Sequence, residues 1–130
     1  MAITLQKQGG LFAVRESNIQ NSIRCALSKH GIVFRTNAGT FYQGKVVFSK
    51  EFGQRVLINL RHVDGLPAGF SDLVFFGPGA HTAFIETKNE VGRLRPEQKV
   101  FLERMQSMGF SAGVARSDAE AVGLIAKEKG

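Results

Sequence analysis

Cysteine, tryptophan and proline are scarce in this chain, with one, none and three respectively among its 130 residues. The single Cys25 excludes an internal disulfide and a zinc site built on cysteines. Long apolar runs are also missing, since stretches such as 73–76 are far shorter than the ~20 residues that cross a bilayer. Because residues 1–14 lack a basic segment followed by an apolar one, we expect no export signal, a cytoplasmic location and no membrane partner.

The composition is that of a folded domain with an uneven distribution of charge. Apolar residues make up 43% and charged residues 22% of the chain, so we expect a single globular domain. Residues 1–65 contain nine lysines and arginines against three acids, while residues 66–130 contain eight of each. This basic excess favours phosphate binding. It is also compatible with charge that only maintains solubility, and net charge alone does not separate the two.

Periodicity predicts an α/β protein with a mixed sheet and helices on its faces. Residues 1–14 are aperiodic and contain Gly9 and Gly10, so we expect a flexible N-terminal arm followed by one domain over 15–130. A helix is expected over 15–30, with a capping box at Ser17 and Gln20. The remaining elements are predicted as strands 32–36, 40–48, 54–60, 70–76, 82–88 and 110–115 and helices 94–108 and 118–127, in which 40–48 and 54–60 form a hairpin.

Three residues on two neighbouring predicted strands point to a specific chemistry. Asp72 begins an otherwise apolar strand, while Glu86 and Lys88 share one face of the next, so a hairpin would bring all three together. Carboxylate oxygens bind Mg²⁺ or Mn²⁺, and a lysine can orient a water or neutralise transition-state charge. This combination is typical of metal-dependent phosphodiester hydrolysis.

Glu16 and Gln98 are polar residues within apolar helical stripes. Glu16 falls among Ile19, Ile23 and Leu27, where it is either paired near the core or simply favourable in the first helical turn. Gln98 is satisfied by the backbone, or else it orients the lysine, a metal-bound water or a DNA phosphate. Both interpretations remain open for each residue.

The order and spacing of short motifs resemble the PD-(D/E)xK nuclease superfamily. Asp72, then Glu86-x-Lys88, then a helix opening Arg95-Pro96-Glu97-Gln98 carry this resemblance. More narrowly, the chain is similar to the virus-type replication-repair nuclease (VRR-NUC) domain over about residues 15–126. The shared segments are Glu16 to Gln20, Gly69 to Asp72, Ile85 to Lys88, Gly92 to Leu94, Pro96 to Leu102 and Gly113 to Arg116.

The resemblance implies a restriction-endonuclease-like core and assigns roles to particular residues. Glu16, Asp72 and Glu86 would form the acidic site for Mg²⁺ or Mn²⁺, with the backbone carbonyl of Thr87 as a further ligand. Lys88 would be the catalytic lysine and Gln98 the helix glutamine. Ser71 stands where the superfamily motif has proline, which concerns backbone shape and removes no ligand.

Stand-alone members of this family are small, often phage-encoded, and similar to dimeric Holliday-junction resolvases. The resemblance therefore implies a homodimer that cleaves branched DNA without a small-molecule cofactor, in the bacterial host cytoplasm if a phage encodes it. A flap or restriction-type nuclease and a non-catalytic DNA-binding protein are the alternatives.

Aromatic residues of the 40–60 hairpin either stack on bases or pack in the core. The basic residues expected to contact DNA are Arg35, Lys45, Lys50, Arg55, Arg61 and Arg93.

Overall fold

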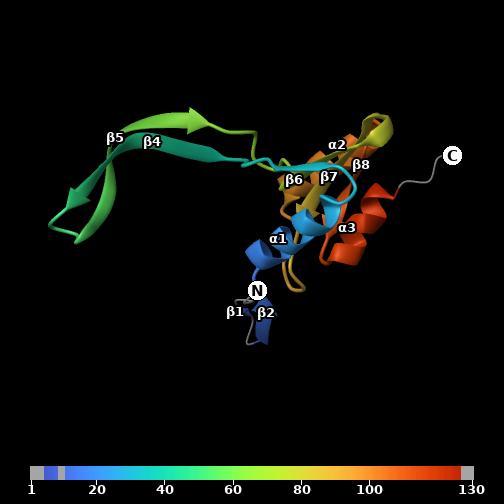
Figure 1. The fold of residues 1–130 in the computed structure, drawn as a ribbon, viewed down its shortest axis with the longest axis horizontal. Coiled ribbons are helices and arrows are strands. Elements are labelled where there is room, and N and C mark those ends of the chain that lie inside the picture. The colour runs from blue at the N-terminus through green and yellow to red at the C-terminus, as the bar shows by residue number, and fades with distance from the viewer. Residues whose placement is uncertain (1–4, 9–10, 127–130) are drawn as a thin grey trace.

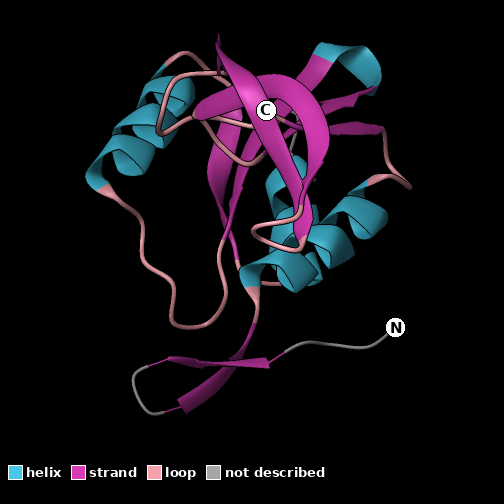
Figure 2. Ribbon diagram, turned by 90° about the vertical axis from the view of Figure 1, so that its left-hand side faces the viewer, coloured by secondary structure: helices cyan, strands magenta, loops and turns pink. Residues whose placement is uncertain are grey.

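A four-stranded mixed sheet organises the protein, which we describe from a computed structural model covering residues 5–8 and 11–126. Its strand order is β3-β6-β7-β8, in which β7 pairs antiparallel with β6 and parallel with β8. Helices lie on both sides of the sheet (Figures 1 and 2). The α/β mixed-sheet class predicted from periodicity is thereby confirmed. The elements of this body are α1 (Glu16–Leu27), β3 (Ile32–Arg35), β6 (Leu73–Gly77), η1 (Pro78–Ala80), β7 (His81–Thr87), α2 (Pro96–Ser107), β8 (Ser111–Ala115) and α3 (Asp118–Ile125).

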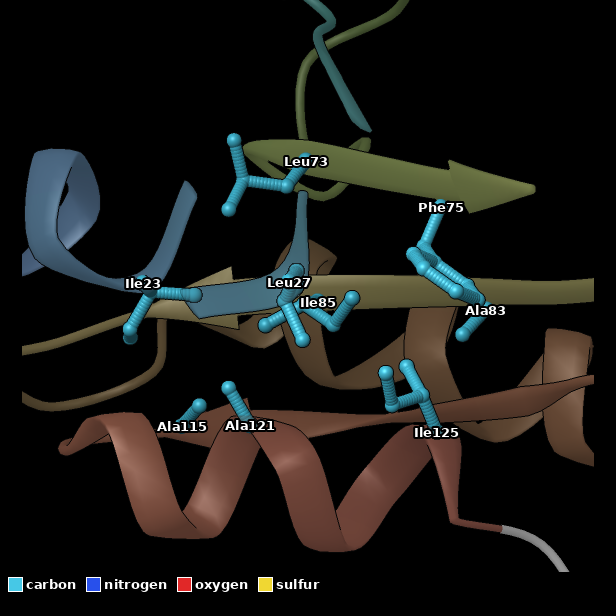
Figure 3. Close-up of a cluster of buried hydrophobic side chains, with 9 residues drawn as sticks. All are labelled: Ile23, Leu27, Leu73, Phe75, Ala83, Ile85, Ala115, Ala121 and Ile125. Carbon is cyan, nitrogen blue, oxygen red and sulfur yellow. The ribbon is translucent and has the colours of Figure 1, made fainter. Parts of the chain in front are cut away.

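One face of the sheet is covered by α1 and α3. The predicted stripe of α1 places Ile23 and Leu27 in the core, where both are fully buried. They pack against alternate residues of the central strands, including Phe75 and Ile85, and against Ile125 of α3 (Figure 3). Because side chains alternate across a strand, the intervening residues must face the other side of the sheet.

The second face is covered only in part, by α2. An aromatic cluster joins this helix to the sheet. The ring centroid of Phe84 lies 5.6 Å from that of Phe101 and 5.5 Å from that of Phe110. The ring centroids of Phe70 and Phe101 are 4.4 Å apart. α2 packs on β7 and β8. The half of this face formed by β3 and β6 therefore receives less cover than the half beneath the helix.

Several predicted boundaries need correction. α1 begins at Glu16 with Arg15 as N-cap, so the capping box expected at Ser17 and Gln20 is wrong. Ordinary helical bonds from Asn18 and Ile19 to the Arg15 carbonyl close the first turn without a side chain. The strand expected from residue 70 begins at Leu73, because residues 67–70 form a turn. For α3, Ser117 is the N-cap, and its side chain accepts from the Glu120 N–H.

A long hairpin of β4 (Thr40–Ser49) and β5 (Gln54–Asp64), here called the arm, projects away from the sheet (Figure 1). The predicted antiparallel pairing is confirmed, and both strands are longer than expected. Phe41, Tyr42 and Phe48 are exposed, so the interpretation that they pack in the core is wrong. Among the described residues no helix covers the arm to provide that core, since α1, α2 and α3 pack on the central sheet (Figure 1).

A second, short hairpin precedes α1. β1 (Leu5–Gln8) pairs with β2 (Leu11–Val14), where the sequence predicted a flexible aperiodic arm over 1–14. Two short strands separated by Gly9-Gly10 are typical of a tight hairpin, a signal that our interpretation overlooked. Within the part of the chain that the structure describes, no helix has the length and apolar character needed to cross a membrane.

Candidate active site

Strand register brings the two predicted carboxylates together. β6 and β7 pair antiparallel with Leu73 opposite Ile85. Continuing that register by one residue places Asp72 opposite Glu86, on the face of the sheet that also carries Phe84. The hairpin expected from the sequence therefore places both acids at the same end of the central strands.

Glu86 is buried and carries an unsatisfied oxygen. Its side chain is 1% exposed, and its Oε2 has no hydrogen-bond partner among the described residues. Burial, followed by the charge of Asp72, raises the pKa of Glu86 from 4.5 to about 8, although Lys88 acts in the opposite direction. Two carboxylates in a dry site repel one another, and a bound cation would remove that repulsion.

Thr87 holds Asp72 in place through two bonds to one oxygen. Its backbone N–H and its hydroxyl both donate to Asp72 Oδ2, at 3.0 and 2.8 Å. Gln20 of α1 in turn donates to the Thr87 hydroxyl at 3.4 Å. Both Thr87 bonds end on Oδ2, so they orient the carboxylate without using Oδ1. The sequence suggested only the backbone carbonyl of Thr87, and its side-chain role was missed.

Gln98 bonds to the backbone, as one of its two alternatives expected, and also to Glu86, which neither alternative named. Its Oε1 accepts from the Arg95 N–H at 2.9 Å, which caps the first turn of α2. Its Nε2 donates to Glu86 Oε1 at 2.9 Å. One buried amide therefore satisfies the helix end and fixes the orientation of the buried carboxylate.

Lys88 lies one residue beyond the end of β7 and pairs with α1. Its Nζ is 3.7 Å from Glu16 Oε1, and the lysine side chain is largely buried while that of Glu16 is 41% exposed. Glu16 also occupies the first turn of its helix, so both interpretations given for it hold. The two N-terminal ends of α1 and α2 thus flank the Asp72 and Glu86 pair.

The loop after β7 closes around the lysine. Asn89 Oδ1 accepts from the Gly92 N–H at 2.7 Å, and Arg116 Nη1 donates to the carbonyls of Asn89 and Gly92 at 2.5 and 2.7 Å. A Cβ on Gly92 would lie 3.3 Å from Lys88 Cδ and 3.4 Å from Glu16 Oε1. This close approach explains why the loop has glycine there, and it limits how far Lys88 can move.

The donor set fits a divalent cation. Asp72 and Glu86 provide hard oxygen ligands, and the unsatisfied Glu86 Oε2 is a buried acceptor that needs a positive partner. No group of three or more His, Cys, Asp or Glu side chains among the described residues is arranged to hold a metal by itself. The fit therefore depends on two carboxylates completed by backbone oxygen and water, as is usual for Mg²⁺.

A polar cleft contains most of the predicted site. Its lining includes every residue predicted to act on the metal or the reaction, and two of the predicted DNA contacts, Arg35 and Arg93. Lys45, Lys50, Arg55 and Arg61 lie on the arm instead. The sequence analysis did not identify Ser17, Gln20 or Arg95 as lining residues, and their neighbours Glu16 and Gln98 on the same helical turns were the available signal. The complete lining is Glu16, Ser17, Gln20, Arg35, Asp72, Glu86, Thr87, Lys88, Arg93, Arg95 and Gln98.

A mixed sheet whose central hairpin gathers acids and a lysine in one cleft has the architecture of a nuclease-like fold. The family model of the VRR-NUC domain matches residues 14–119, and the chain belongs to this family. The family implies a nuclease that acts on DNA. A solved structure described as a VRR_NUC domain matches with a TM-score of 0.49 and 20% identity, covering 85% of this chain and 92% of that one. No curated protein matches the chain.

Proposed function

We propose that this chain is a Mg²⁺- or Mn²⁺-dependent endonuclease that hydrolyses phosphodiester bonds in branched DNA, such as four-way junctions. The observation that carries the proposal is the juxtaposition of Asp72, the buried Glu86 with its unsatisfied oxygen, and Lys88 in one cleft. Membership of a nuclease family supports the reaction class. The absence of an evident base-reading helix in the sequence favours recognition of DNA by shape.

Each residue of the cleft has a distinct task in this proposal. Asp72 and Glu86 hold the cation, with the Thr87 carbonyl as an additional ligand and Glu16 at the edge of the site. When bound, the cation polarises the phosphoryl oxygen and lowers the pKa of a coordinated water. Lys88 orients the attacking water and stabilises negative charge on the phosphoryl group, while Gln98 keeps Glu86 in position.

Basic residues of the cleft and of the arm bind the phosphates of the DNA strand in this proposal. Arg35 and Arg93 line the cleft, and the arm carries four further basic residues, Lys45, Lys50, Arg55 and Arg61. A homodimer would present two such cleft-and-arm surfaces to a substrate that has twofold symmetry. We place this activity in the cytoplasm, that of a bacterial host if a phage encodes the protein.

The direct test is cleavage of labelled four-way junctions, flaps, duplex and single strands with Mg²⁺ or Mn²⁺. Asp72→Asn and Glu86→Gln should each reduce cleavage by at least about 100-fold, because each removes ligand charge at nearly constant volume. Circular dichroism should show that both variants keep the fold. Glu103→Gln, which changes an exposed acid on α2, is the matched control and should cleave like the original chain.

The same panel decides among the alternatives. Full activity in excess chelator would contradict the metal-dependent mechanism. Preference for flaps or for duplex would support a flap or restriction-type nuclease, and metal-independent binding without cleavage of any substrate would support a non-catalytic DNA-binding protein.

A further inference from the structure

A second pocket opens off the cleft, where the arm joins the body. We call it the side pocket. Its volume is about 420 Å³, which lies in the range of pockets that hold one small organic ligand. The side pocket is continuous with the cleft, because five residues line both. These shared residues are Gln20, Arg35, Asp72, Arg95 and Gln98.

The side pocket is charged only where it meets the cleft. Its charged lining residues, Arg35, Asp72 and Arg95, all belong to the cleft as well. The residues that line the side pocket alone are uncharged, and they include the aromatic Phe41 and Phe70. A phosphate bound inside would need positive charge around it. The lining instead favours a flat, uncharged group that stacks on aromatic rings, as a nucleobase does.

The two phenylalanines reach the side pocket from different parts of the fold. Phe70 is held by the aromatic cluster, with its ring centroid 4.4 Å from that of Phe101 and 5.8 Å from that of Phe84. Phe41, near the start of β4, packs against Gly65, where a Cβ would lie 2.7 Å from Phe41 Cε2. Phe41 is nevertheless 42% exposed. The body therefore fixes one ring, and the other keeps a free surface for a ligand.

Hydrogen bonds tie the base of the arm to the sheet, so the side pocket is formed before a ligand binds. The Thr36 N–H donates to the Asp72 carbonyl at 3.0 Å, and the Thr36 hydroxyl donates to the Ser71 carbonyl. The Gly39 N–H donates to the Leu66 carbonyl at 2.9 Å. These bonds hold the segment that carries Phe41 next to the strand end that carries the catalytic carboxylate.

Two polar side chains of the lining are available for a nucleotide. Neither Asn37 nor Arg35 has a side-chain hydrogen bond or ion pair to another residue in the described part of the chain. The Asn37 amide can both donate to and accept from the edge of a base. Arg35 lies at the boundary between the side pocket and the cleft, where its guanidinium can bind a backbone phosphate.

We propose that the side pocket binds one unpaired nucleobase of the DNA, from a nucleotide adjoining the phosphate held in the cleft. The proposal rests on the proposed nuclease function and adds a specificity-determining part to that site. The base stacks on Phe41 and meets the Asn37 amide, while Arg35 holds the phosphate beside it.

This arrangement supplies a physical reason for a preference for branched DNA. A base stacked inside a duplex cannot enter a pocket, so it must first be unpaired and extruded. That step costs least where the base is already mismatched or single-stranded, as at a branch point. The side pocket would therefore select the structure of the DNA by the ease of extruding a base.

The first test is amide NMR of the metal-free protein with two probes, deoxyadenosine 5′-monophosphate and 2-deoxyribose 5-phosphate. At millimolar concentration the nucleotide should shift the signals of Asn37, Gly39 and Phe70, and the sugar phosphate, which has no base, should leave them unchanged. Equal shifts with both probes would show a phosphate site and overturn the proposal. An absence of shifts with the nucleotide would overturn it as well.

A cycle that combines protein variants with abasic DNA then tests Phe41. The DNA of the cleavage panel that binds most tightly in chelator is prepared with an abasic site at each position in turn. At one position the original chain should lose affinity by about tenfold, because a base stacked on an aromatic ring contributes roughly that much. Phe41→Leu should lose a similar factor on intact DNA and nothing further on the DNA that is abasic at that position. Phe41→Tyr, which keeps the ring, should bind like the original chain.

Controls separate the side pocket from the arm and from catalysis. Phe52→Ala, which changes a 65% exposed phenylalanine in the turn between β4 and β5, should bind every DNA like the original chain. Equal losses by Phe41→Leu on intact and on abasic DNA would show that Phe41 does not contact a base, and would overturn the proposal. Glu86→Gln should keep the dependence on the base, since Glu86 does not line the side pocket. Failure of the proposed nuclease activity and failure of the side pocket are thus measured independently.

Discussion

At the scale of single residues, two carboxylates of the cleft, those of Glu86 and Glu16, differ in their surroundings. Glu86 is buried against Gln98 and Asp72, whereas Glu16 is partly exposed and neutralised by Lys88. Carboxylates that differ in this way can have different tasks within one site. Glu86, the buried acid, is the one that most needs a cation. Glu16, the partly exposed acid, limits the mobility of Lys88.

Replacing Lys88 should affect turnover rather than metal binding. Lys88→Ala removes the ammonium group from the cleft but leaves Asp72 and Glu86 unchanged, so we expect at least a 100-fold loss of single-turnover rate. Isothermal calorimetry with Mn²⁺ should still show binding. Lys99→Ala, on the exposed surface of α2, is the control. Loss of metal binding in Lys88→Ala without another defect would show that its role is assigned wrongly.

The raised pKa of Glu86 predicts how stability depends on pH. A carboxyl with a folded-state pKa of about 8, against an ordinary value of 4.5, binds its proton more tightly in the folded chain. Its stabilising contribution in metal-free protein is therefore complete below about pH 4.5 and is lost as the pH rises toward about 8.

Glu86→Gln removes this titration while preserving the shape of the side chain. In chelator at pH 8 the variant should melt several degrees above the original chain, and the difference should shrink toward pH 5. Thermal melts across this range measure the effect, with Glu103→Gln as control. Equal melting temperatures at pH 8 would contradict the assignment. Adding Mg²⁺ should stabilise the original chain and leave Glu86→Gln nearly unchanged.

At the scale of elements, the start of α2 links helix capping to the site. The Gln98 amide accepts from Arg95 and donates to Glu86, so one side chain supports both functions. Gln98→Ala removes both bonds, and we expect a loss of about 1–2 kcal/mol in unfolding free energy together with lower activity. Chemical denaturation and the cleavage rate measure the two effects.

Gln98→Glu separates the contribution of the helix cap from that of the hydrogen bond to Glu86. It keeps an acceptor for the Arg95 N–H but places a second carboxylate against Glu86, so activity should fall while the cap is retained. Activity equal to that of the original chain would show that the donor to Glu86 is unimportant. Unchanged stability in Gln98→Ala would show that the cap contributes little.

At the scale of the whole molecule, binding to DNA should depend strongly on salt. If basic residues of the cleft and arm contact DNA as proposed, they displace counterions from phosphates, and the logarithm of the affinity should fall linearly with the logarithm of salt concentration. Lys45→Ala should reduce the magnitude of this slope by about one and weaken junction and duplex binding alike. Lys29→Ala, an exposed position after α1, is the control. An unchanged slope for Lys45→Ala would show that this part of the arm does not contact the DNA phosphates.

The element order and the central hairpin were predictable because they follow from local patterns. Alternation in 82–88, the proline at 96 and the Ser117 cap each determine structure within a few residues. The register of two adjacent antiparallel strands is similarly local, which is why the approach of Asp72 to Glu86 was foreseen. The β1–β2 hairpin was within reach of the same rules but was missed.

Contacts between distant segments were decided only by the tertiary structure. The sequence marked Glu16 and Gln98 as polar residues in apolar stripes, but the partners that explain them, Lys88 and Glu86, come from other elements. The Thr87 bonds to Asp72 and the exposure of the arm likewise depend on how the sheet and helices pack. Periodicity indicates which side of an element is apolar, because the pattern depends only on residues close together in the sequence. It does not indicate which element covers that side, because the choice of covering element depends on the packing of the whole chain.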